Sequence, residues 1–216
     1  MLCITGKETC VRTLNARIDE GDRQLKRTGV EASMHELRLD ALEKIDDETF
    51  GLIEKLGRRA LVCCRPTREG GAFEGEESAR LELLERAHLA GARFVDIEHD
   101  VPEAKLGKFE RQNIVLSRHD FRGVPPKAAT MIQEMAERQV GAVKLACQVN
   151  TVEELAPLHQ AARDLQRQDQ AAAIIGMGAA GLVSRSHYRA FGSAWTYIAA
   201  TPETATAPGQ LDLKVA

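Results

Sequence analysis

Short apolar runs alternate along the chain with longer stretches in which apolar residues recur at helical spacing. Most of the runs are rich in valine, isoleucine, leucine, cysteine or aromatic residues. Runs of this length and composition are typical of parallel strands that are buried on both faces. The pattern therefore predicts eight strands, at 2–5, 35–40, 60–65, 94–100, 113–121, 142–147, 172–178 and 195–200.

Helix signals occupy most of the intervals between these runs. Pro126 stands at a first-turn position, Thr151 opens a T-V-E-E sequence close to a capping box, and Gly91 is a candidate C-cap. Strands that alternate with helices predict an α/β fold, and eight of them favour a closed (β/α)8 TIM barrel over an open doubly wound sheet. Amphipathic spacing predicts helices over 8–27, 76–88, 126–138, 151–168 and 184–192.

The chain has the length of one domain of this class. Its 216 residues contain no linker, no low-complexity segment and no shift of composition that would separate two domains. We expect a single (β/α)8 barrel catalytic domain over 1–216.

Composition excludes several classes of partner. Lysine and arginine number 29 against 32 acidic residues, so the formal net charge is −3, and only nine residues are aromatic. A nucleic-acid surface usually needs a basic patch and stacking rings, and no apolar run approaches the roughly 18 residues of a membrane span. The five cysteines include no C-x-x-C pair, which disfavours a disulfide framework or a zinc knuckle. We expect a cytoplasmic protein without nucleic-acid or membrane partners.

Charged residues interrupt the predicted strands. Glu36, Arg38 and Asp40 alternate and would share one face of their strand, as would Asp96 and Glu98 on another. An unpaired charge in such a place costs several kcal/mol. One interpretation is an ion-pair layer, in which these acids neutralise Arg38, Arg65 and Lys144. The other is an active site, which is favoured because the charges lie near the carboxyl ends of strands, where barrel enzymes build their sites.

Lys144 is the most informative of these residues. An amine held among Val143, Leu145 and Ala146 would be desolvated, which lowers its pKa and raises the share of the neutral nucleophile. Such a lysine can attack a ketone to form a Schiff base. His119, one strand earlier, could then act as general base and acid. The alternatives are a lysine that snorkels from a strand end and a structural histidine.

A glycine motif and the other histidines carry less information. Gly176, Gly178 and Gly181 imitate a dinucleotide fingerprint, but the next strand does not end in the acid that this motif needs. The glycines better suit a loop whose backbone approaches a substrate. The histidines show no metal-binding spacing, so we expect neither a cofactor nor a metal.

Seven short motifs together resemble the type I 3-dehydroquinate dehydratases, Schiff-base enzymes of the shikimate pathway. They are E-L-R-L-D at 36–40, R-P-T-R-E-G-G at 65–71, D-I-E at 96–98, S-R-H-D-F at 117–121, V-K-L-A at 143–146, G-x-x-S-R at 181–185 and T-A-P-G-Q at 206–210. Each motif alone is weak. All seven occur in the order found in the family, within or just after a predicted strand.

The resemblance implies a role for each candidate residue. Lys144 would form an imine with 3-dehydroquinate, His119 would transfer protons, and Glu69 would orient His119. Arg185 would hold the substrate carboxylate, and residues 201–212 would form a lid. The remaining substrate-binding residues would be Thr5, Glu36, Arg38, Arg65, Thr206 and Gln210.

Two other functions remain open on the sequence. A class I aldolase would share the buried lysine without needing Arg185 and the T-A-P-G-Q segment. A silent binding or regulatory barrel would usually have lost one of the reactive residues. The expected partner is a small-molecule substrate, and a homodimer is left open.

Overall fold

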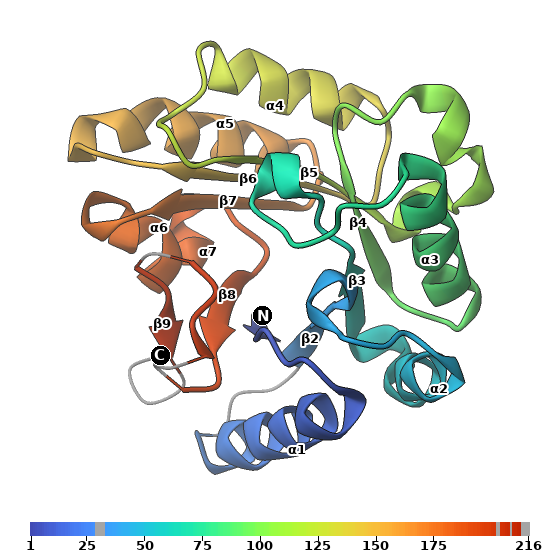
Figure 1. The fold of residues 1–216 in the computed structure, drawn as a ribbon. Helices are drawn as coiled ribbons and strands as arrows, with labels where there is room; N and C mark the ends of the chain where they lie inside the picture. The colour runs from blue at the N-terminus through green and yellow to red at the C-terminus, as the bar shows by residue number, and fades with distance from the viewer. Residues whose placement is uncertain (29–32, 202–203, 208, 213–216) are drawn as a thin grey trace. The chain divides into compact units, whose positions relative to one another are not determined.

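Parallel strands and helices alternate along the chain in a computed structural model that describes residues 1–28, 33–201, 204–207 and 209–212 (Figure 1). All eight predicted strand segments contain a strand, so these predictions are confirmed. The strands are β1 (Leu2–Thr5), β2 (Ser33–Arg38), β3 (Ala60–Cys63), β4 (Phe94–Glu98), β5 (Ile114–Asp120), β6 (Ala142–Gln148), β7 (Ala172–Met177), β8 (Thr196–Ala199) and β9 (Leu211–Asp212). The helices are α1 (Val11–Thr28), α2 (Asp47–Leu56), α3 (Glu77–Leu89), α4 (Ala128–Glu137), α5 (Leu155–Arg167), α6 (Leu182–Ser186) and α7 (Tyr188–Phe191).

The chain divides into two compact units. The first comprises Met1–Asp96, Tyr197–Thr206 and Asp212–Ala216, and the second comprises Ile97–Thr196 and Ala207–Leu211. In the first unit β2 pairs in parallel with β1 and β3, and β3 pairs in parallel with β4. In the second unit β6 pairs in parallel with β5 and β7.

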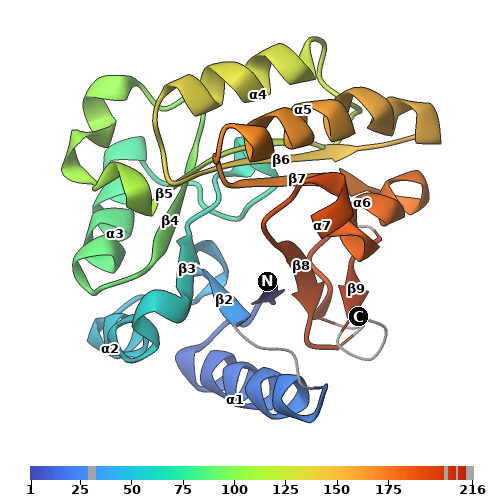
Figure 2. The same cartoon turned by 180° about the vertical axis from the view of Figure 1, so that it is seen from behind.

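Helices cover the strands of each unit through their apolar stripes. In the first unit α1 buries Leu14, Ile18 and Leu25, which lie on one side of the helix. In the second unit α4 and α5 lie side by side along β6 and β7, as both views show (Figures 1 and 2). Strands β6 and β7, which these helices cover, are buried along almost their whole length. Apart from Lys144 and Gln148, their residues are apolar or glycine.

Helix α2 was missed by the sequence patterns, although its start is strongly specified. The Asp46 side chain accepts hydrogen bonds from the backbone N–H groups of Glu48 and Thr49, at 3.1 and 3.3 Å. The Thr49 hydroxyl accepts in return from the backbone N–H of Asp46, which completes a capping box. Phe50 and Ile53 are then buried beneath the helix.

Several predicted helix boundaries were wrong in detail. Helix α4 begins at Ala128, because Lys127 has a φ of 58° and cannot be helical, so Pro126 lies in the preceding turn. Thr151 makes no capping bond, and Glu154 instead accepts from the backbone N–H of Asn150 at 2.8 Å. The single helix predicted over 184–192 is two short helices, α6 and α7.

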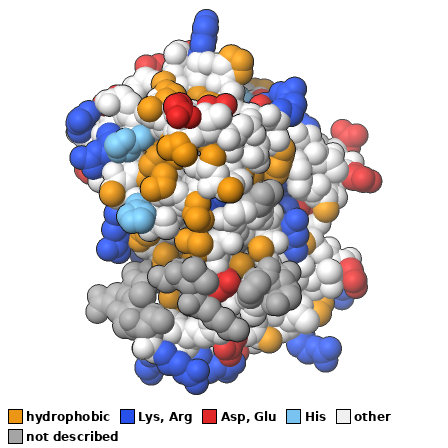
Figure 3. Space-filling model, turned by 90° about the vertical axis from the view of Figure 1, so that its left-hand side faces the viewer, with side chains coloured by type: hydrophobic (Ala, Val, Ile, Leu, Met, Phe, Trp, Pro, Cys, Tyr) orange, Lys and Arg blue, Asp and Glu red, His pale blue; other side chains and the backbone are white. Residues whose placement is uncertain are grey.

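The surface of the second unit carries an apolar groove of about 360 Å³. Figure 3 shows hydrophobic side chains gathered beside two histidines on one face of the molecule. Within the residues described, no helix has both the length and the apolar character needed to cross a membrane. The groove is lined by Val152, Leu155, Ala156, His159, Val183, His187, Ala190 and Phe191.

Candidate active site

Thr5 and Glu36 form a buried polar pair at the carboxyl ends of β1 and β2. The Thr5 hydroxyl donates a short hydrogen bond to the Glu36 carboxylate, and Thr5 is fully buried while Glu36 is 5% exposed. Neighbouring parallel strands place the two side chains on the same side of the sheet. Both were predicted as substrate-binding residues, and the structure brings them together.

Arg38, the last residue of β2, forms a two-pronged ion pair with Asp40. The Arg38 Nε and Nη2 atoms lie 2.8 and 2.6 Å from the two oxygens of Asp40. Burial alone would raise the pKa of Asp40, but hydrogen bonds from Arg38 and from the backbone N–H groups of Arg65 and Ala72 hold it below its usual value. Burial likewise opposes the charge of Arg38, and Asp40 outweighs it, so the pKa of Arg38 is raised.

Arg65 lies between two acids at the end of β3. Its Nη2 atom is 2.7 Å from Asp96, and its Nη1 atom is 3.7 Å from Glu69. All three side chains are buried, and Glu69 ends a single 3₁₀ turn that begins at Thr67. The acids therefore neutralise part of the positive charge that Arg65 brings into the interior. Ion pairing, the first of the two interpretations of the strand charges, is thus present here.

Three buried donor atoms in the same unit come within 4.8 Å of one another, on Glu36, Cys63 and Asp96. The two carboxylates already contact Thr5 and Arg65. Burial raises the pKa of the Cys63 thiol well above its usual value, which keeps the sulfur protonated. A metal binds the thiolate, so this donor set is poorly prepared for one.

Lys144 lies on β6 of the second unit, next to small residues. In the strand register its neighbours are Ser117 on β5 and Ala173 on β7. Ala142 and Ala146, two positions away on β6, point to the same side. Lys144 is only 4% exposed, and these four neighbours are also buried. Lys144 is thus a buried charged residue whose neighbours on the strands are small.

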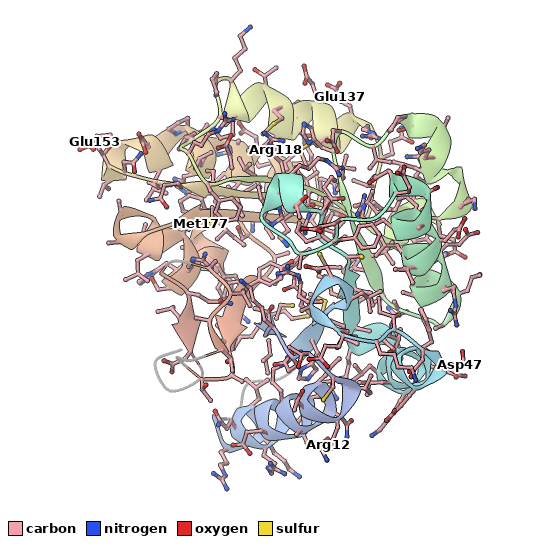
Figure 4. The ribbon with its side chains drawn as sticks, viewed as in Figure 1. Arg12, Asp47, Arg118, Glu137, Glu153 and Met177 are labelled. Carbon is pink, nitrogen blue, oxygen red and sulfur yellow. The ribbon has the colours of Figure 1, made fainter. Side chains whose placement is uncertain are left out.

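His119 shares the face of the sheet that carries Lys144. It lies two residues beyond Ser117, the register partner of Lys144, and its own partner is Ala146. Strand spacing and rise put the Cα atoms of His119 and Lys144 about 8 Å apart, a diagonal that long side chains span. His119 is half-buried, whereas Lys144 is buried. Arg118, labelled in Figure 4, alternates with His119 and so belongs to the opposite face.

Arg185 is held by the glycine motif that follows β7. Its Nε atom donates to the carbonyl of Gly176 at 3.2 Å, and the side chain is 2% exposed. The Ser184 hydroxyl bridges the same turn, accepting from the Gly176 N–H at 2.8 Å and donating to the Gly181 carbonyl at 2.7 Å. Burial lowers the pKa of Arg185 to about 10, so it stays charged at neutral pH.

The predicted lid is described only in part. Within the second unit a Cβ at Gly209 would lie 2.9 Å from the carbonyl oxygen of Gly178, so this part of the segment touches the turn that follows β7. Gln210 donates its backbone N–H to the Ala207 carbonyl at 3.2 Å. Thr206 belongs to the first unit and is half-buried. Residues 202, 203 and 208 of the predicted lid lie outside the described residues.

Solved structures identify the fold. A 3-dehydroquinate dehydratase from Geobacillus kaustophilus matches 99% of this chain and 86% of its own, with a TM-score of 0.80 and 23% identity. The enzyme from Aquifex aeolicus matches 99% and 94%, with a TM-score of 0.76 and 22% identity. The fold is therefore the (β/α)8, TIM-barrel-like fold, as predicted.

The sequence itself assigns the family. A model of the type I 3-dehydroquinase family matches residues 9–216. The 3-dehydroquinate dehydratase of Syntrophobacter fumaroxidans is 34% identical over 186 residues, which cover 81% of this chain and 80% of the relative. One from Dehalococcoides mccartyi is 32% identical, covering 84% and 82%. The chain belongs to the type I 3-dehydroquinase family of hydro-lyases.

Proposed function

We propose that this chain dehydrates 3-dehydroquinate to 3-dehydroshikimate through an imine on Lys144, as a step of the shikimate pathway. The observation that carries the proposal is a lysine that is only 4% exposed on a central strand, with Ser117 and Ala173 as its neighbours in the strand register. His119 shares that face of the sheet, one strand away. A nucleophilic amine with a proton-transfer group nearby is what eliminating water next to a ketone requires.

Lys144 begins the reaction as a neutral amine. Its nitrogen adds to the C3 ketone carbon of the substrate, and the ketone oxygen leaves as water after two proton transfers, giving a protonated imine. The positive nitrogen withdraws electrons from the neighbouring C2–H bond and makes that proton acidic.

His119 moves the protons that the elimination needs. Its imidazole takes the C2 proton, and the electron pair released forms the C1–C2 double bond as the C1 hydroxyl departs. The imidazolium returns its proton to that leaving group, so one water is lost. A second water then hydrolyses the imine and releases the product and Lys144. Glu69 is proposed to orient the imidazole for both transfers.

The remaining candidates bind the substrate. Arg185 offers a charged group fixed by the Gly176 carbonyl, which suits recognition of the substrate carboxylate. Residues 201–212 are proposed to close as a lid and keep water from the imine. Hydroxyl groups of the substrate are assigned to Thr5, Glu36, Arg38, Arg65, Thr206 and Gln210.

Turnover by the purified protein tests the proposal. We expect 3-dehydroquinate to be converted to the conjugated enone acid, followed by its ultraviolet absorption. Lys144→Ala should remove this activity, whereas Lys105→Ala, at an exposed position of the second unit, should keep it. No conversion by the wild type, or conversion by Lys144→Ala at the wild-type rate, contradicts the proposal.

Two expectations about the protein in solution remain predictions. A homodimer is tested by sedimentation equilibrium of the purified chain, and a cytoplasmic location by fractionation of the cells that produce it.

A further inference from the structure

Arg17 of α1 is a buried arginine that spans the ends of two strands. It is 6% exposed, and its Nε atom is 2.9 Å from the carboxylate of Glu8. Its Nη1 atom donates to the Ile4 carbonyl at 3.0 Å, and its Nη2 atom donates to the Glu36 carbonyl at 2.9 Å. One planar group thus joins the backbones of β1 and β2.

Those two carbonyls belong to the residues that carry the Thr5–Glu36 pair. The Ile4 carbonyl is part of the peptide bond to Thr5, and the Glu36 carbonyl is on the backbone of the glutamate itself. The last register pair of β1 and β2 is Ile4 with His35, one residue before Thr5 and Glu36 on each strand. Arg17 therefore bonds to both strands at the end of their register, where the two side chains emerge.

Arg80 of α3 likewise holds a backbone carbonyl, that of Cys64, one residue beyond β3. It is fully buried, and its Nη1 atom donates to the Cys64 carbonyl at 3.0 Å. Its Nε and Nη2 atoms bond to Glu77 at 2.9 and 2.7 Å. The Cys64 carbonyl is part of the peptide bond to Arg65. A second helix arginine, again neutralised by its own glutamate, thus fixes the backbone of a proposed substrate-binding residue.

Apolar packing alone does not explain these arginines. Leu14 and Ile18 flank Arg17 on the buried side of α1, and Leu84 and Ala87 follow Arg80 on that of α3. A buried ion pair of this kind usually adds little to stability compared with apolar residues of the same volume. What a guanidinium adds is several fixed donors, and buried carbonyls at the end of a strand need donors.

We propose that Arg17 and Arg80 are positioning residues for substrate binding: Arg17 fixes Thr5 and Glu36, and Arg80 fixes Arg65. The proposal rests on the proposed function, since it assigns these three side chains to the substrate. Loss of either arginine frees a strand end and lets the binding side chains leave their places. The effect falls on KM more than on kcat, because Lys144 and His119 lie on other strands.

Steady-state kinetics of Arg17→Met and Arg80→Met test the proposal. We expect KM for 3-dehydroquinate to rise about tenfold in each variant, with kcat within about twofold of the wild type. Arg17→Lys keeps the charge but cannot reach both carbonyls, so its KM should lie between that of the wild type and that of Arg17→Met. Arg12→Met is the matched control. Arg12, labelled in Figure 4, is exposed on α1, and its replacement should leave KM unchanged.

A double-mutant cycle separates positioning from a general loss of stability. If Arg17 acts partly through Glu36, then Arg17→Met should raise KM by a smaller factor in a Glu36→Gln background than in the wild type. Each variant is assayed below its own unfolding temperature, and the folded fraction is measured by circular dichroism. Arg17→Lys and Arg80→Met keep the test decisive if Arg17→Met does not fold.

The outcomes distinguish the two proposals. An active wild type whose KM is unchanged in folded Arg17→Lys and Arg80→Met overturns the positioning role alone. Additive effects of Arg17→Met and Glu36→Gln also overturn the route through Glu36. An inactive wild type overturns the proposed function and, with it, the positioning role.

Discussion

The carboxylate of Asp40 accepts both prongs of the Arg38 guanidinium, at 2.8 and 2.6 Å, and forms the centre of a buried network. The same two oxygens accept the backbone N–H groups of Arg65 and Ala72, at 2.9 and 3.0 Å. One acid therefore fixes an arginine on β2 and the segment that follows β3. Asp40 belongs to the E-L-R-L-D motif, yet it was not among the predicted site residues.

Replacing Asp40 tests this arrangement. Asp40→Asn keeps the volume but removes the charge that balances the half-buried Arg38, so we expect the free energy of unfolding to fall by about 3 kcal/mol. Urea denaturation measures the change. Asp169→Asn is the control: this residue is exposed, and asparagine tolerates its φ of 58°. If both substitutions lowered the free energy of unfolding equally, the Asp40 network would not be what stabilises the protein.

The fold was largely predictable because its signals are local. Buried parallel strands need short apolar runs, and such runs are visible in the sequence around Val143 and Ile174. Lys144 stood out for the same reason, as a charge inside such a run. Helix α2 was missed even though Asp46 and Thr49 form a capping box and Phe50, Ile53 and Leu56 recur at helical spacing.

The partners of the charged residues were not predictable in the same way. Alternation puts Arg38 and Asp40 on one face, but the choice of Asp96 for Arg65 depends on how the strands align. No role was predicted for Arg17 or Arg80, although a charged residue within the apolar stripe of a helix indicates a buried polar contact. These arginines bond to backbone carbonyls, and every residue has a carbonyl, so the sequence does not show which ones they bind.

Acid should destabilise the protein through His35. This residue is fully buried on β2, with Nε2 2.9 Å from the Asp22 carboxylate, and burial lowers its pKa to about 4. In the unfolded chain a histidine titrates near pH 6.5, so between these values the unfolded state binds a proton that the folded state does not. Stability therefore falls as pH drops from about 6.5, by up to about 3 kcal/mol at pH 4.

Unfolding curves at a series of pH values measure this dependence. His35→Gln removes the titrating group and should flatten the slope between pH 6.5 and 4. His159→Gln, at an exposed position on α5, should retain it. A slope that is unchanged in His35→Gln would assign the acid sensitivity to other groups.

The glycine turn beneath Arg185 should tolerate no side chain. A Cβ at Gly181 would lie 2.4 Å from the carbonyl carbon of Gly176, the residue whose oxygen holds Arg185. We expect Gly181→Ala to cost about 2 kcal/mol of stability and to raise KM, because the turn must open. Thermal unfolding and steady-state kinetics measure the two effects.

Gly51 in α2 provides the opposite case. A Cβ there meets nothing within 4 Å, and the residue lies inside a helix. Gly51→Ala should stabilise the protein by about 0.5–1 kcal/mol and leave KM unchanged. If Gly181→Ala behaved like Gly51→Ala, the close approach at Gly176 would not matter for binding.

His119 should be dispensable for forming the imine on Lys144 but required for the elimination of water. His119→Ala leaves Lys144 and its register neighbour Ser117 unchanged. We expect product formation to fall at least about 100-fold, while mass spectrometry of the intact protein still detects bound substrate. Turnover at the wild-type rate would remove His119 from the proton transfers.

The most direct measurement traps the covalent intermediate. The protein is mixed with 3-dehydroquinate and reduced with borohydride, and the modified peptide is located by mass spectrometry. The account predicts a reduced adduct on Lys144, absent when substrate is omitted. An active enzyme that yields no adduct, or one whose adduct lies on another lysine, would contradict it.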